Sequence, residues 1–125
     1  MINKRVLLVD DEPDIILTLK IVLEENGFKV DSFTDPLSAL QNFKEYDGMY
    51  DMVILDIRMP NMNGFELYRQ IKKIDDKVKV CFLTASEMSY GETAYEDIFN
   101  RLDGRYFIQK PIENEKLIAR LNKIK

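Results

Sequence analysis

Histidine is absent from this sequence of 125 residues, and cysteine occurs only once. The lack of histidine removes the commonest general base and the usual side-chain ligand of transition metals. A single cysteine excludes a disulfide framework within the chain, and Cys81 lies in the apolar run from Val78 to Leu83, as expected of a small buried side chain in a reducing cytosol. Any chemistry must therefore use carboxylates, hydroxyls and lysine.

Long apolar stretches and basic clusters are also missing. The first apolar run, Val6 to Val9, is much shorter than the core of a signal peptide, and no stretch approaches the length of a membrane span. The formal charge is −4 and the Lys and Arg residues form no stripe, which argues against direct binding to nucleic acid. We expect a cytoplasmic protein that binds neither membranes nor nucleic acid.

Linker-like segments rich in Gly, Ser or Pro are absent, and the sequence contains no repeats. Hydrophobic residues make up 46% of the chain and charged residues 32%, which is typical of a globular domain. The 125 residues suffice for one hydrophobic core but not for a second module with its own core. We expect a single domain over residues 1–125, without an output domain.

Short apolar, β-branched runs alternate with segments whose apolar residues recur at helical spacing. The runs are Arg5 to Val9, Phe28 to Phe33, Met52 to Leu55, Val78 to Leu83 and Tyr106 to Ile108. Helical stripes are expected over residues 15–23, 67–74, 94–102 and 117–124, and Asp35-Pro36 is typical of a helix N-terminus. This alternation predicts a doubly wound α/β fold, a parallel sheet with helices on both faces.

Polar side chains follow four of these predicted strands. Asp10 and Asp11 follow the first, Asp56 the third, Thr84 the fourth and Lys110 the fifth. In doubly wound sheets the ligand site lies beyond the carboxyl ends of the strands. Each residue alone has an ordinary explanation, since Asp10 or Asp11 could cap the next helix and Asp56 could begin a turn. Together, clustered carboxylates without His or Cys favour a Mg²⁺ site.

Four motifs at these strand ends resemble those of two-component response-regulator receiver domains. They are Leu8-Val9-Asp10-Asp11-Glu12, Ile54-Leu55-Asp56-Ile57-Arg58-Met59-Pro60-Asn61-Met62-Asn63-Gly64, Leu83-Thr84-Ala85 and Gln109-Lys110-Pro111. The resemblance covers essentially the whole chain, and four motifs in order are far more specific than any one of them. It implies a flavodoxin-like (βα)5 fold whose five parallel strands lie in the order 2-1-3-4-5.

The resemblance implies that Asp56 accepts a phosphoryl group. It also implies that Asp11, Asp56 and the backbone carbonyl of Arg58 ligate Mg²⁺, with Mn²⁺ as an alternative ion, and that Asp10 holds metal-bound water. In this scheme Asp56 attacks phosphorus in line while the metal neutralises charge on the transferring oxygens. Lys110 would offer these oxygens a second cation.

Further positions take roles from the same resemblance. Thr84 would donate its hydroxyl to a phosphate oxygen, and Lys110-Pro111 would be a cis peptide bond that aims the lysine inward, although a trans turn is the general expectation. Pro60 and Gly64 would shape the loop after the phosphoacceptor, where punctuation of an ordinary loop is the alternative. Arg58 and Ser86 would set how quickly water removes the phosphate. The alternative is that both are ordinary solvated surface residues.

Switching in the family involves the hydroxyl at the Thr84 position and an aromatic side chain three residues before the lysine. Here that aromatic residue is Phe107, because strand alternation places Phe107 and Gln109 on one face and Tyr106 and Ile108 on the other. Ordinary packing within the strand is the alternative for Phe107. The interval from Thr84 to Lys110 is 110 − 84 = 26 positions, longer than is usual in the family, so an extended loop or a longer fourth helix is expected there.

The leading hypothesis is a stand-alone receiver that takes phosphate from a sensor histidine kinase or a phosphotransfer protein and signals to a downstream protein, as a monomer or a phosphorylation-dependent homodimer. A magnesium-dependent phosphohydrolase with an aspartyl nucleophile is the rival, but Arg58 stands where such enzymes commonly carry a second aspartate. A flavin carrier of the same fold is disfavoured because Asp10-Asp11-Glu12 would repel the flavin phosphate. A receiver-like docking module that is never phosphorylated is a third alternative, against which the complete acid set counts.

Overall fold

The structure is a computed structural model that describes residues 4–84, 107–110 and 113–123. In chain order its elements are β1 (Arg5–Val9), α1 (Pro13–Glu25), β2 (Lys29–Phe33), α2 (Pro36–Glu45), β3 (Met52–Asp56), α3 (Gly64–Ile74), β4 (Lys79–Thr84), β5 (Phe107–Gln109) and α5 (Asn114–Lys123). Each predicted strand is present within about two residues of its expected bounds. The stripe predicted over residues 94–102 lies outside the described residues.

The strands form one parallel sheet in the order β2-β1-β3-β4-β5. The chain therefore moves from β1 to β2 on one side and returns to place β3 on the other side of β1. Such a reversal opens a crevice beyond the carboxyl ends of the two central strands, where doubly wound folds hold their ligands. The predicted fold class and strand order are confirmed.

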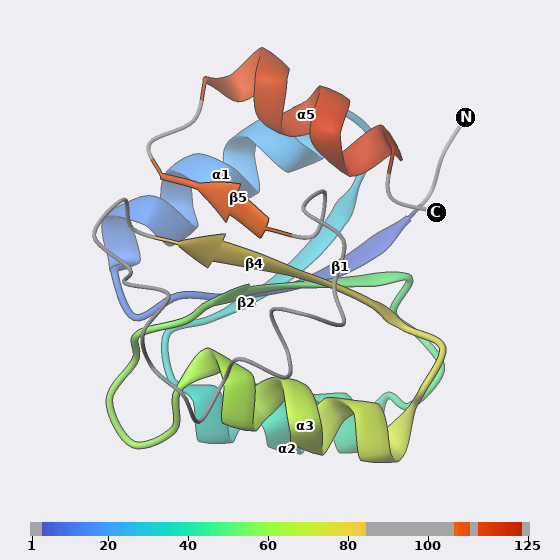
Figure 1. Cartoon of the computed structure of the whole chain (residues 1–125). Helices are drawn as coiled ribbons and strands as arrows, with labels where there is room; N and C mark the ends of the chain where they lie inside the picture. The colour runs from blue at the N-terminus through green and yellow to red at the C-terminus, as the bar shows by residue number, and fades with distance from the viewer. Residues whose placement is uncertain (1–3, 85–106, 111–112, 124–125) are drawn as a thin grey trace.

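Helices cover both faces of the sheet: α1 and α5 lie on one face, and α2 and α3 lie on the other (Figure 1). Because β3 is the middle strand, both of its faces are covered and all five of its residues are buried. In the described ranges no helix is long and apolar enough to cross a membrane. The sheet thus separates two apolar clusters, one beneath each pair of helices.

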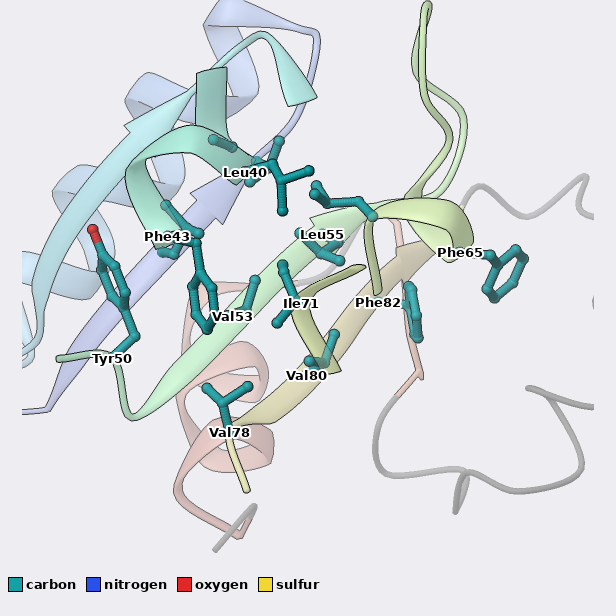
Figure 2. Packing of buried hydrophobic residues seen from close by; sticks show 14 of the residues in the cluster. Leu40, Phe43, Tyr50, Val53, Leu55, Phe65, Ile71, Val78, Val80 and Phe82 are labelled. Atoms are coloured by element: carbon teal, nitrogen blue, oxygen red, sulfur yellow. The ribbon is translucent and has the colours of Figure 1, made fainter. Parts of the chain in front are cut away.

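The cluster beneath α2 and α3 is rich in aromatic side chains (Figure 2). Phe82 of β4 lies 5.0 Å from Phe65, 5.5 Å from Tyr68 and 5.4 Å from Phe107, measured between ring centroids. Truncating a buried phenylalanine to alanine typically costs about 3–5 kcal/mol, so Phe82 contributes strongly to holding α3 and β5 on this face. Phe65 follows the first residue of α3, and the packing therefore bears directly on the loop that follows β3.

Side chains cap the N-termini of two helices. Asp35 caps α2 by accepting a hydrogen bond from the backbone N–H of Ser38, as predicted. Asn63 caps α3 through the N–H of Glu66 and donates back to the Glu66 carboxylate, a reciprocal pair. The N-cap of α1 is Glu12, which makes no side-chain cap. The alternative in which Asp10 or Asp11 caps this helix is therefore wrong.

Candidate functional site

Three carboxylates meet at the carboxyl edge of the sheet. Asp10 and Asp11 follow β1, and Asp56 is the last residue of β3; each offers an oxygen within 4.8 Å of the others. The pairing of Val9 with Leu55 brings the ends of β1 and β3 to the same level, which explains the convergence. Asp10 is fully buried and Asp56 is 7% exposed, so these charges have little access to water.

Lys110 brings a positive charge into this acidic cluster from β5, two strands away from β3. Its Nζ lies 2.7 Å from Asp10 Oδ2 and 3.4 Å from Asp56 Oδ1. Burial lowers the pKa of Lys110, but its hydrogen bond to Asp10 and the two negative charges outweigh that effect and the pKa is raised. The ammonium group therefore stays protonated and offsets part of the negative charge.

Backbone donors orient two of the carboxylates. The N–H of Glu12 donates to Asp10 Oδ1 at 3.0 Å, and the N–H of Ile57 donates to Asp56 Oδ1 at 2.9 Å. In the described part of the chain, every buried side-chain nitrogen or oxygen has a hydrogen-bond partner. The acidic cluster is thus held in place by the strand ends themselves.

The environment of Asp56 disfavours its charged form. Burial is the largest cause, followed by the charge of Asp10, while the charge of Lys110 acts in the opposite direction and a hydrogen bond with Asp11 raises the pKa further. Together they raise the pKa of Asp56 to about 6. A buried carboxylate beside other carboxylates is the arrangement that a bound cation stabilises.

The donor set fits Mg²⁺ rather than a transition metal. It consists of carboxylate oxygens without His or Cys, which is the preference of a hard cation. Arg58 follows Asp56 by two residues, and its side chain is exposed. The expected roles of Arg58, of its backbone carbonyl and of Asp10 toward metal-bound water stay predictions.

The loop from Asp56 to α3 returns to the strand end at Gly64. The Gly64 N–H donates to the Ile57 carbonyl at 2.7 Å, and a Cβ on Gly64 would overlap the backbone carbonyl oxygen of Asp56 and lie 2.9 Å from Ile57 Cα. In the middle of the loop, the Met62 N–H donates to the Pro60 carbonyl across Asn61, which has a φ of 72°. This loop therefore requires a residue without a side chain where it touches the backbone of Asp56.

The remaining predicted residues lie on β4 and β5 or outside the described ranges. Thr84 ends β4, one position after Leu83, the register partner of Asp56. Phe107 is partly buried and stacks on Phe82 with an angle of 19° between the rings, while Ile108 packs into the cluster on the other face. The predicted alternation along β5 is confirmed for these two residues. Ser86 and Pro111, with its peptide bond to Lys110, lie outside the described residues.

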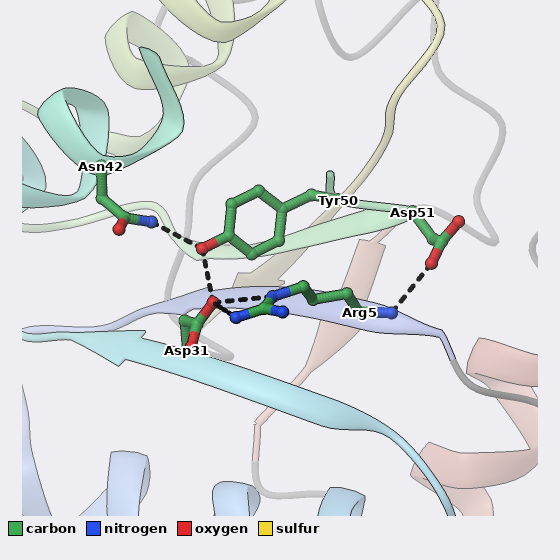
Figure 3. Close-up of polar contacts among 5 residues, drawn as sticks. All are labelled: Arg5, Asp31, Asn42, Tyr50 and Asp51. Carbon is green, nitrogen blue, oxygen red and sulfur yellow. Dashed lines mark hydrogen bonds and ion pairs between the residues drawn. The ribbon is translucent and has the colours of Figure 1, made fainter. Parts of the chain in front are cut away.

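Sequence reasoning missed a polar network that begins at the first residue of β1 (Figure 3). The hydroxyl of Tyr50 donates to Asp31 Oδ2 at 2.6 Å and accepts from the amide of Asn42 at 2.6 Å, and Arg5 Nε donates to the same Asp31 oxygen at 3.0 Å. Asp51 accepts the backbone N–H of Arg5 at 2.8 Å. No local signal predicts these contacts, because the partners come from β1, β2, α2 and the segment before β3.

Burial of Asp31 raises its pKa, but hydrogen bonds from Tyr50 and Arg5 outweigh this effect and the pKa is lowered. Burial and the hydrogen bond to Asp31 raise the pKa of Tyr50 to about 12. The network ties α2 to the sheet away from the acidic cluster, so we interpret it as structural.

The arrangement of strands and acids corresponds to a known class of fold and site. Residues 6–122 match the response regulator receiver domain family. The chain is 32% identical to the chemotaxis protein CheY of Thermotoga maritima, covering 98% of each, and 35% identical to a CpxR homolog of Haemophilus influenzae, covering 96% of this chain and 49% of that protein. The chain spans about half the length of several curated relatives that it matches.

Solved structures give the same result. A response regulator receiver domain protein from Clostridium thermocellum superimposes with a TM-score of 0.81 at 28% identity, covering 95% of this chain and 91% of that one. CheY of Borrelia burgdorferi, in a complex with CheX, has a TM-score of 0.80 at 27% identity, covering 94% and 86%. The chain belongs to the response-regulator receiver family, and its function is that of a signalling switch in phosphorelay signal transduction.

Proposed function

We propose that Asp56 is the phosphoacceptor of this receiver and that its aspartyl phosphate is the signal. The supporting observation is the convergence of Asp10, Asp11 and Asp56 at one strand edge with Lys110 Nζ 3.4 Å from Asp56 Oδ1. Asp56 is the member of the set on the central strand and lies against Lys110. Unlike Asp10, which lies closer to Lys110 but is fully buried, Asp56 keeps some exposure to a phosphoryl donor.

The proposed reaction is a transfer to a side-chain oxygen of Asp56. A carboxylate oxygen of Asp56 forms a bond to phosphorus, and the bond from phosphorus to the donor nitrogen or oxygen breaks with its electron pair going to the donor. Lys110 compensates the charge on the phosphoryl oxygens, and the Thr84 hydroxyl donates to one of them. Gly64 and Pro60 would hold the loop that follows Asp56, and the role expected of Pro111 in aiming Lys110 falls outside the described residues.

Asp11, Asp56 and the backbone carbonyl of Arg58 would hold Mg²⁺, or Mn²⁺ as the alternative ion, and Asp10 would hold metal-bound water. When bound, the ion neutralises charge on the transferring oxygens. The all-oxygen donor set and the burial of Asp10 and Asp56 support this assignment. The solved Borrelia burgdorferi structure is a complex of CheX and CheY with BeF3 and Mg²⁺.

The phosphoryl donor would be a sensor histidine kinase or a phosphotransfer protein, because this chain has no histidine of its own to carry phosphate. One structural neighbour is the receiver domain of the hybrid histidine kinase CckA, with a TM-score of 0.75 at 25% identity. The recipient of the signal would be a downstream protein that binds the receiver as a monomer or as a phosphorylation-dependent homodimer. A cytoplasmic location and the absence of an output domain stay predictions.

The readout would involve Thr84 and Phe107. By the family resemblance, the ring of Phe107 would turn from outside to inside on phosphorylation. Because Phe107 already stacks on Phe82, this turn would exchange one packed position for another. Arg58 and Ser86 would tune hydrolysis of the aspartyl phosphate. Turnover would be limited to the phosphate on Asp56 itself, and steady multiple turnover of small phosphoesters would instead support the alternative, a magnesium-dependent phosphohydrolase.

The test is incubation with acetyl phosphate and Mg²⁺, followed by measurement of the intact mass. We expect the mass to rise by one phosphoryl group in the wild type and in Asp47→Asn, a control at an exposed aspartate. We expect no increase in Asp56→Asn or when EDTA replaces Mg²⁺. A mass that never rises, or that rises equally in Asp56→Asn, would refute the proposal.

A further inference from the structure

β5 is short, although it positions Lys110, the cation of the acidic cluster. It has three residues, Phe107–Gln109, and pairs with β4 alone because it lies at the edge of the sheet. Such a short edge strand has few ladder hydrogen bonds to hold it. Lys110 nevertheless follows β5 directly, and its Nζ lies 2.7 Å from Asp10 Oδ2 and 3.4 Å from Asp56 Oδ1.

Arg120 of α5 supplies a further attachment for this strand. Its Nη2 donates to the backbone carbonyl of Phe107 at 2.7 Å in a partly buried position. α5 itself is docked on the sheet, because Leu117 and Leu121 are each 1% exposed and pack into the cluster beneath α1 and α5. A charge-assisted hydrogen bond from a docked helix thus reaches the first residue of β5.

The two sides of Phe107 are held by different elements. Its ring packs on Phe82, in the cluster beneath α2 and α3, whereas its carbonyl is held by α5 on the opposite face of the sheet. Lys110 lies three positions further along the chain. Because a strand is stiff over this length, fixing the backbone at Phe107 limits where the Lys110 side chain can begin.

We propose that Arg120 is a positioning residue that anchors β5 and thereby keeps Lys110 in the acidic cluster. It acts through Lys110 and does not itself touch the reacting groups. Its consequence for phosphoryl transfer rests on the proposed function, but its effect on Lys110 does not. Loss of the Arg120 donor should free Lys110 without unfolding the domain.

The first experiment measures the reactivity of Lys110 in EDTA, by competitive amine labelling and mass spectrometry. Arg120→Met keeps the apolar stem but removes the donor, and Arg120→Lys keeps a donor. Lys116→Met is the matched control at an exposed cation of the same helix, and the exposed Lys29 is an internal reference. We expect Lys110 labelling to rise several-fold in Arg120→Met relative to Lys29, and to remain near the wild-type level in Arg120→Lys and Lys116→Met.

A thermal unfolding curve for each variant confirms that labelling is measured on folded protein. Equal labelling of Lys110 in the wild type and Arg120→Met would overturn the proposal. A rise in labelling at every lysine would also overturn it, because that result indicates general loosening and not a local anchor.

The second experiment measures the rate of phosphorylation by acetyl phosphate in saturating Mg²⁺. We expect Arg120→Met to slow the reaction by about tenfold, well within the effect of a misplaced catalytic group, and Arg120→Lys to recover most of the rate. The double variant Lys110→Met/Arg120→Met should be no slower than Lys110→Met, because both changes remove the same lysine from the site. Independent, multiplicative losses would overturn the positioning role.

The two experiments separate the two proposals. If wild-type protein takes up no phosphate while Lys110 labelling still rises in Arg120→Met, the proposed function fails and the anchoring role stands. If the wild type is phosphorylated but Arg120→Met behaves like Lys116→Met in both measurements, the proposed function stands and the anchoring role is refuted.

Discussion

The ammonium group of Lys110 lies closer to Asp10 than to Asp56, at 2.7 Å from Asp10 Oδ2 and 3.4 Å from Asp56 Oδ1. Asp10 is fully buried, so its charge depends on partners within the protein. Lys110 therefore has a role in the unphosphorylated protein as well. In this structure it compensates the most deeply buried acid of the site.

Removing the Lys110 ammonium group should destabilise the protein, because the buried acids depend on its charge. We expect Lys110→Met to lower the free energy of unfolding in EDTA by about 2–4 kcal/mol, because two buried carboxylates lose their cation. Mg²⁺ should restore part of the loss, since it supplies positive charge at the same acids. Urea unfolding with and without Mg²⁺ measures both effects, and Lys116→Met should change neither; an equally stable Lys110→Met would contradict the interpretation.

Asp56→Asn should stabilise the protein without metal. The pKa of Asp56 rises from 3.8 to about 6 in the folded protein, so the folded state binds the proton more tightly than the unfolded state. The favourable contribution of this group is fully present below pH 3.8 and is lost as the pH rises through about 6. At about pH 8 in EDTA, Asp56→Asn should thus be more stable than the wild type by about 1–3 kcal/mol.

This difference should shrink as the pH falls toward the pKa of the unfolded aspartate, and Mg²⁺ should reverse it by stabilising only the wild type. Chemical unfolding across this pH range is the measurement. A variant that is less stable than the wild type in alkaline EDTA would show that the attraction of Lys110 exceeds the cost of burying Asp56.

Tyr50 should lose its proton unusually late. Its folded-state pKa is raised from 10.0 to about 12, so the stability it contributes is fully present below pH 10.0 and is lost as the pH rises through about 12. Tyr50→Phe should cost about 1–2 kcal/mol at neutral pH, because Asp31 and Asn42 lose a partner, and this cost should narrow toward pH 12. Ultraviolet titration of tyrosinate should lose its latest step in Tyr50→Phe and keep it in Tyr46→Phe, a control at an exposed tyrosine.

The turn at Asn61 should respond to the shape of its side chain. Asn61 has a φ of 72°, and the hydrogen bond from Met62 to Pro60 closes a three-residue turn around it. Asn61→Gly should be tolerated within about 0.5 kcal/mol, whereas a β-branched residue, Asn61→Val, should cost about 1–3 kcal/mol. Thermal unfolding measures the difference, and equal stability of the two variants would show that the turn can change its conformation freely.

Gly64→Ala tests the approach of α3 to the phosphoacceptor strand. The new Cβ would overlap the carbonyl oxygen of Asp56, which is backbone and can move only by shifting the strand end. We expect a loss of about 2–4 kcal/mol together with slower phosphorylation. Gly48→Ala is the control, because Gly48 has a φ of 83° but its Cβ would meet nothing within 4 Å. If Gly64→Ala loses less than about 1 kcal/mol and is phosphorylated as fast as Gly48→Ala, the strand end yields to the new methyl group and the close approach does not require glycine.

The order of elements was readable from the sequence because its signals are local. Apolar runs alternate with helical stripes, Asp35-Pro36 begins a helix, and parallel strands bring Asp10 and Asp56 to one edge whatever their distance along the chain. For the same reason the acidic cluster could be predicted as a group, before any distance was known. Strand alternation also predicted correctly that Phe107 and Ile108 face opposite ways.

The tertiary structure decided how the charges are shared and which residues hold them. Arg5 and Tyr50 both donate to Asp31, Lys110 lies nearer to Asp10 than to Asp56, and Arg120 donates to the backbone of Phe107. These contacts depend on side-chain conformation and on the packing of helices against the sheet. The spacing of apolar residues in the sequence predicts neither of these. The sequence by itself determined the fold and the membership of the acidic cluster, because both follow from strand ends. Only the folded chain determined the partners of each charge, because they are set by distances of a few ångströms between segments far apart in the sequence.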